Sequence, residues 1–126
     1  MPLRFRDDLR AAIPLALFLE ARDVKRTADD RRFSLMVRER DHFTCQRCGA
    51  VHMPTSQGLH SAHMFGRGKP ATRLDPENSC ALCYGCHRHL DTHPDLKREF
   101  FRLRLGDDVF EALELRSNRP RQDDPR

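Results

Sequence analysis

Two short stretches decide the fold of this chain: Cys45-Gln46-Arg47-Cys48-Gly49 and Cys83-Tyr84-Gly85-Cys86. Each contains a Cys-x-x-Cys pair, and 34 residues separate the two pairs. A two-residue gap lets both sulfurs of a tight turn face one ion, so two such pairs can close a tetrahedral thiolate site. Four thiolates favour a structural Zn²⁺. The sequence therefore predicts a zinc site at the centre of the chain, and removal of the ion should unfold that region.

A fifth cysteine leaves the ligand set open at this point. Cys80, Cys83 and Cys86 are evenly spaced, so the second pair is either 80/83 or 83/86. A different interpretation of all five residues is a set of small buried thiols or a redox pair. Two Cys-x-x-Cys pairs in a small polar chain favour metal binding over that interpretation.

Composition bounds the function classes. The 126 residues suit one domain, or a small core with helical extensions. Hydrophobic residues make up 38% and charged residues 33%, and there is no Trp, which argues against a large apolar ligand pocket. The net charge of +4 permits nucleic-acid binding without demanding it. No segment is a polybasic tail, so such contacts would depend on individually placed arginines.

The N-terminal region contains an apolar run at residues 11–19 behind several arginines, which faintly resembles a secretory signal. Asp7 and Asp8 interrupt the basic segment, and nine apolar residues are too few to span a bilayer. We expect a packed helix there, a cytoplasmic protein and no membrane partner. In the cytoplasm, cysteines bind metal more often than they form disulfides.

The fold class expected is a small α+β protein in three zones. Residues 1–40 form a helical extension, residues 41–93 the core, and residues 94–126 C-terminal helices with a polar tail. The first zone contains an apolar stripe interrupted at Pro14, then a helix at 29–38 capped by Asp29 or Asp30. In the core we expect a strand at 58–64, a strand or turn at 79–82 and a helix at 83–91. In the last zone a helix starts at Pro94 and ends at Gly106, and Asp107 or Asp108 caps the next.

Apolar periodicity predicts which side chains are buried. The expected positions are Leu9, Ile13 and Leu17, then Phe33, Met36 and Val37 beside Arg40, then Leu96, Phe100, Leu103 and Phe101, and finally Val109, Phe110, Leu113 and Leu115.

The middle of the chain resembles the HNH endonucleases, the ββα-metal family, from about residue 33 to residue 93. The matching pieces are the two cysteine pairs, Ser61-Ala62-His63-Met64, Asp75-Pro76-Glu77-Asn78 and Leu82-Cys83-Tyr84-Gly85-Cys86-His87. Small phage and prophage members are the most similar, through Thr72-Arg73-Leu74-Asp75-Pro76. The resemblance places a histidine directly after the last zinc ligand, so it favours Cys45, Cys48, Cys83 and Cys86 as ligands and makes Cys80 a small buried residue.

The resemblance also implies roles for three polar residues. His63 is the general base that takes a proton from the attacking water, which suits an imidazole near neutral pH. His87 is a ligand of a catalytic divalent cation such as Mg²⁺ or Mn²⁺. Asn78 fixes the loop to the helix, and in some members it binds the metal. The implied reaction is hydrolysis of DNA phosphodiester bonds, by nicking or cleavage with low sequence specificity, leaving 5′ phosphates.

One position departs from the family pattern. The family commonly has Asp or His just before the catalytic histidine as a metal ligand, and here that position is Ala62. Asp91, four residues after His87 on the same helical face, and Asn78 are the candidate replacements. His60 is a poor candidate, because strand alternation turns it away from His63. His89 and His93 are expected at the surface or facing DNA.

The expected partner is duplex DNA, in a bacterial or phage-infected cell, together with DNA-processing proteins such as a phage terminase. Candidate phosphate contacts are Arg47, Arg67, Lys69, Arg73 and Arg88, with Arg73 favoured. The competing hypothesis is a non-catalytic zinc-binding adaptor for DNA or protein, which keeps the four-thiolate site and needs no second metal.

Overall fold

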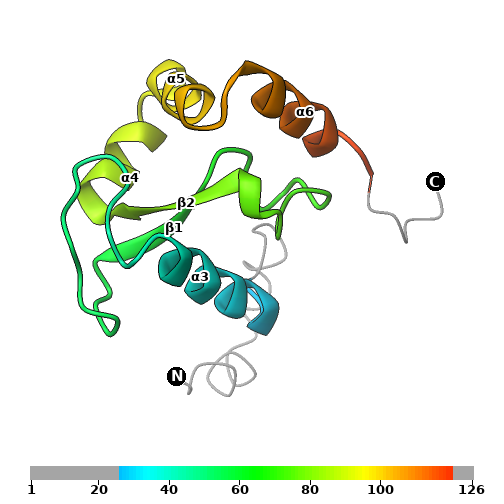
Figure 1. Ribbon diagram of the computed structural model, residues 1–126. Coiled ribbons are helices and arrows are strands. Elements are labelled where there is room, and N and C mark those ends of the chain that lie inside the picture. Colours follow the sequence, from blue (N-terminus) through cyan, green and yellow to red (C-terminus); the bar gives the residue numbers. More distant parts are fainter. Residues whose placement is uncertain (1–25, 121–126) are drawn as a thin grey trace, which may run out of the picture.

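The computed structural model describes residues 26–120, and within that range it is a small α+β domain with two strands and four α-helices. The strands β1 (Leu59–His63) and β2 (Ser79–Cys83) form an antiparallel hairpin. Helix α3 (Ala28–Arg40) lies along one side of it (Figure 1). Helices α4 (Tyr84–Asp91), α5 (Pro94–Leu105) and α6 (Asp107–Ser117) follow β2 in sequence. The stripe expected around Leu9, Ile13 and Leu17 lies outside the described residues.

The hairpin register determines where the polar residues of interest lie. Leu59 pairs with Cys83 and His63 with Ser79, so β1 ends at His63 where β2 begins. Cys83 ends β2 and caps α4 directly, with no intervening loop. The strand at 58–64, the strand at 79–82 and the helix at 83–91 are thereby confirmed within one or two residues.

Helix α3 begins with a capping box. The Thr27 side chain accepts from the Asp30 backbone N–H at 3.1 Å, and the Asp30 carboxylate accepts from the Thr27 N–H at 2.7 Å. The expected cap at Asp29 or Asp30 is therefore wrong, because Asp30 is the third helical residue of the box. Phe33 and Val37 are buried as expected, but Met36 is 38% exposed, since it points away from the hairpin.

The end of α3 is joined to β2 by charged side chains. Arg40 donates to the backbone oxygens of Pro76 at 2.9 Å and Ser79 at 2.7 Å. The buried Asp41 carboxylate accepts from the Ala81 N–H at 2.8 Å. These bonds fix the position of α3 against the sheet and satisfy backbone groups at the start of β2.

The C-terminal helices close the core through Phe101, Phe110 and Leu113, which are fully buried. Leu96 and Phe100 pack partly buried against the same cluster, as expected. Three other expectations are wrong: Leu103, Val109 and Leu115 are exposed, since only one narrow stripe of each helix meets the core. The expected cap at Asp107 or Asp108 is also wrong, because Gly106, with φ of 88°, precedes α6 and no side chain caps it.

Candidate functional site

The two Cys-x-x-Cys segments form similar turns, in each of which a backbone N–H donates to the sulfur of the first cysteine. Around the first, the Cys48 N–H donates to Cys45 Sγ at 3.4 Å, and Gly49 takes the positive φ of 80° that lets the chain reverse. Around the second, the Cys86 N–H donates to Cys83 Sγ at 3.4 Å at the start of α4. Each turn therefore stabilises one sulfur with a backbone donor while both sulfurs face the same space.

The four sulfurs fit a metal ion such as zinc. The Sγ atoms of Cys45, Cys48, Cys83 and Cys86 all lie within 4.8 Å of one another, and the Cys48–Cys83 separation is 3.8 Å. Zn–S bonds of about 2.3 Å in a tetrahedron place sulfurs about 3.8 Å apart. Burial acts to raise the pKa of Cys45, but backbone donors from Cys48, Cys83 and Arg47 outweigh it and lower that pKa to about 6.

Cys80 is not a ligand of this cluster. It lies on β2, is fully buried in the core and is absent from the group of sulfurs that converge. Burial raises the pKa of its thiol to about 12, which keeps it protonated. The structure thus resolves the spacing ambiguity in favour of the 83/86 pair.

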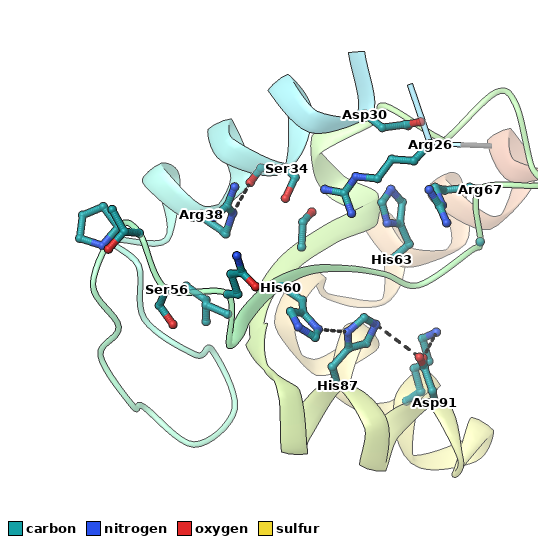
Figure 2. Close-up of a pocket in the computed structure, with 17 residues that line it drawn as sticks. Arg26, Asp30, Ser34, Arg38, Ser56, His60, His63, Arg67, His87 and Asp91 are labelled. Carbon is teal, nitrogen blue, oxygen red and sulfur yellow. Dashed lines mark hydrogen bonds and ion pairs between the residues drawn. The ribbon is translucent and has the colours of Figure 1, made fainter. Parts of the chain in front are cut away.

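A second feature is a cavity of about 720 Å³ between α3, β1 and α4 (Figure 2). It contains His60, His63, His87 and Asp91 from the central zone, so three of the sequence-selected polar residues meet there. Its cationic side chains are Arg26, Arg38, Arg67 and Lys97. The loop at residues 54–57 also borders the cavity.

His63 is held in one tautomer at the end of β1. Its Nε2–H donates to the backbone oxygen of Arg73 at 2.9 Å, which leaves the Nδ1 lone pair available. The Phe33 ring lies 5.7 Å from the imidazole between centroids. Burial and, to a lesser extent, the nearby positive charge of Arg67 lower the His63 pKa below its usual value. The imidazole is therefore neutral at pH 7.

His87 lies between His60 and Asp91. Its Nδ1 is 2.9 Å from His60 Nδ1, and its Nε2 is 3.3 Å from Asp91 Oδ2 (Figure 2). Lys97 donates to the other oxygen of Asp91 at 2.9 Å. Burial lowers the His87 pKa, so this imidazole too is neutral at pH 7. Alternation along β1 made His60 a poor ligand candidate, yet His60 borders the same cavity as His63 and contacts His87 on α4.

Asn78 does not border the cavity. It is fully buried, and its amide bridges the loop after β1: Oδ1 accepts from the Phe65 N–H at 2.8 Å, while Nδ2 donates to the oxygens of Phe65 at 2.8 Å and Thr72 at 3.0 Å. The structure thus gives Asn78 a loop-fixing position, and as a metal ligand it would have to give up these bonds.

The candidate phosphate contacts are distributed over several environments. Arg67 borders the cavity, whereas Arg73 makes a two-pronged ion pair with the buried Asp30. That pairing argues against the preference for Arg73, since its guanidinium already binds a carboxylate of α3. Outside the cavity, Lys69 bonds Asn118 at 3.0 Å, Arg88 bonds Tyr84 at 3.3 Å, and Arg47 lies 3.5 Å from Cys86 Sγ.

Sequence reasoning missed the cavity-facing side of α3. Arg26, Asp30, Ser34 and Arg38 follow one another at four-residue intervals and all border the cavity. Helical spacing could have identified this polar stripe. Arg26 lies beside His63 in Figure 2, and its positive charge and that of Arg67 act on one another.

A scan against protein-family models and searches of curated proteins and solved structures found no match to this chain. Among the described residues, no helix is long and apolar enough to cross a membrane.

Proposed function

We propose that this protein is a divalent-metal-dependent endonuclease that hydrolyses DNA phosphodiester bonds, with the ββα arrangement of the HNH family. One observation carries the proposal: a neutral His63 with a defined free Nδ1 lies in the same cationic cavity as His87. General-base chemistry needs such an imidazole, and a phosphodiester needs nearby positive charge. The strand–strand–helix order of β1, β2 and α4 supports the family assignment.

The geometry supports the following proposed roles for the chain's own residues. His63 accepts the proton of the attacking water at Nδ1, and the Arg73 carbonyl oxygen holds the ring in place. Arg26 and Arg67 bind phosphate oxygens beside it, because no ion pair or hydrogen bond within the described residues occupies their guanidinium groups. A divalent ion bound at His87 would supply charge stabilisation for the phosphorane and the leaving 3′ oxygen.

Other pieces of the proposal rest on the same cavity. Duplex DNA is the proposed substrate, in the cytoplasm of a bacterial or phage-infected cell. The zinc cluster has a purely structural role. It fixes the start of α4, and therefore His87, against the turn that contains Cys45 and Cys48. No recognition helix or repeated finger is present in the described residues, so weak sequence preference is expected.

The test is nicking of supercoiled plasmid by zinc-loaded protein with Mg²⁺ or Mn²⁺. His63→Ala should abolish nicking, whereas His89→Ala, an exposed histidine on α4 outside the cavity, should not change it. Because the His63 pKa is lowered, the acid limb of the rate–pH profile should fall below about pH 6.5.

Equal nicking by wild type and His63→Ala would refute the general base. Absence of nicking with any divalent ion, together with one tightly held zinc, would favour the non-catalytic adaptor. The four-sulfur cluster is the observation that supports that second candidate, since it needs nothing from the cavity.

A further inference from the structure

Core packing alone does not explain the close contact between His60 and His87. The two Nδ1 atoms are 2.9 Å apart, with ring centroids 5.1 Å apart and planes at 77°. The Tyr84 ring lies edge-on to the His60 ring, with centroids 5.9 Å apart. Neither imidazole is fully buried, so both could satisfy their nitrogens with water instead.

The separation of the two nitrogens matches that of neighbouring ligands on one ion. Imidazole nitrogens bind divalent metals at about 2.0–2.1 Å, and two such bonds at right angles place the nitrogens about 2.9 Å apart. The observed Nδ1–Nδ1 distance is therefore that of adjacent octahedral positions. An ion there would replace the hydrogen between the two nitrogens, and His60 would then carry its proton on Nε2.

The far side of His87 carries the partner that metal-binding histidines usually have. Asp91 Oδ2 lies 3.3 Å from Nε2, the nitrogen opposite the one that faces His60. Lys97 holds the other oxygen of that carboxylate. A carboxylate on the second ring nitrogen fixes the tautomer in which Nε2 carries the proton and Nδ1 has the lone pair.

Solvent reaches the pair from two directions. His60, His87 and Asp91 border the main cavity and also a second hollow, on the side of Tyr84 and Arg88. An ion between the two imidazoles would keep several water ligands and could reach a phosphate in the main cavity.

We propose that His60 and His87 bind one divalent transition-metal ion through their Nδ1 atoms, and that Asp91 is a positioning residue that orients His87. Two imidazole ligands favour ions such as Ni²⁺, Co²⁺ or Zn²⁺ over Mg²⁺, which prefers oxygen. The site deepens the proposed function by naming the ligands of its ion, and it rests on that function for the ion's role but not for its binding.

The test is calorimetric titration of the full-length, zinc-loaded chain with Ni²⁺ and separately with Mg²⁺, with zinc content measured before and after. Wild type should take up one Ni²⁺ beyond the structural zinc and show much weaker Mg²⁺ binding. Asp91→Asn should weaken Ni²⁺ binding by about 10–100-fold. His60→Ala should weaken it further, and His89→Ala should leave it unchanged.

Equal Ni²⁺ affinity in wild type and His60→Ala, or no Ni²⁺ uptake beyond zinc, would overturn the site and leave a hydrogen-bonded imidazole pair. Far-UV circular dichroism shows whether each variant is folded. Because Asp91 lies on the exposed surface of α4, Asp91→Asn is a second test of the site in a variant that should fold. Plasmid nicking separates the two proposals: nicking with Mg²⁺ but no Ni²⁺ site overturns this inference alone. Ni²⁺ binding without nicking by any ion supports the site and overturns the endonuclease.

Discussion

Replacement of Asn78 by Ala should destabilise the zinc-loaded domain strongly without touching the cavity. The change removes one acceptor and two donor contacts, so the Phe65 N–H and the Phe65 carbonyl oxygen lose the Asn78 side chain as a partner. The Thr72 carbonyl oxygen loses one of two bonds and keeps the Asp75 N–H at 3.1 Å. Each buried polar group left unpaired costs about 1–3 kcal/mol. Phe65 is only partly buried, so water can reach its groups, and a total loss of about 3–5 kcal/mol in the free energy of unfolding is expected.

Urea unfolding of the zinc-loaded protein, followed by far-UV circular dichroism, measures that loss. Asn118→Ala is the matched control, because Asn118 is exposed and also bonds through its amide, to Lys69 and Glu114. The control should change stability by less than about 0.5 kcal/mol. An Asn78→Ala loss below about 1 kcal/mol, or one equal to the control, would refute the assignment of Asn78 as the residue that holds the 64–78 loop.

Two further predictions concern the zinc site and the α3 ion pair. Cys48→Ser should lose zinc and most of the helical circular dichroism, whereas Cys80→Ala should retain one zinc per chain by atomic emission; zinc loss in both would contradict the ligand set. Asp30→Asn should destabilise the protein by about 2 kcal/mol at pH 7, because Arg73 and then the Thr27 donors hold the pKa of the Asp30 carboxyl well below its usual range. A depressed pKa adds stability above the unfolded value of about 3.9 and loses it as pH falls through the folded value, so the wild-type advantage in urea unfolding should shrink below about pH 4; an advantage that stays constant from pH 7 to pH 3 would contradict this.

Local features of the chain were predictable because short-range geometry decides them. A Cys-x-x-Cys turn brings its two sulfurs together within four residues, whatever the rest of the fold does. The strand ends near residues 63 and 79 and the helix start at Pro94 were likewise predictable from nearby turn and cap residues. Whether Cys80 belongs to the zinc ligands was not predictable in this way, because it depends on β2, which directs the Cys80 side chain into the core.

Long-range pairings were not predictable from the same signals. Alternation along β1 gives the face on which His60 lies, but not which element covers that face, and α4 covers it with His87. The partner of Arg73 is Asp30, 43 residues away on α3, and no local pattern connects them. In α5, periodicity left Leu103 and Phe101 as candidates for one stripe, and only the packing of the folded core selects Phe101.

The distribution of arginine partners bears more on DNA binding than the net charge of +4. Many guanidinium groups in the described part of the chain are already paired with carboxylates, and these are Arg32, Arg40, Arg73, Arg98, Arg102, Arg104 and Arg116. Such residues hold the fold together and are poorly placed to take a phosphate as well. Arg26 and Arg67 differ, because no carboxylate pair or hydrogen bond involves them in residues 26–120 and both border the cavity near His63. Two like charges near one another are unfavourable by themselves and become favourable when an anion lies between them. The electrostatic case for a phosphodiester therefore depends most on these two side chains: Arg67, which the sequence singled out, and Arg26, just before α3, which it did not.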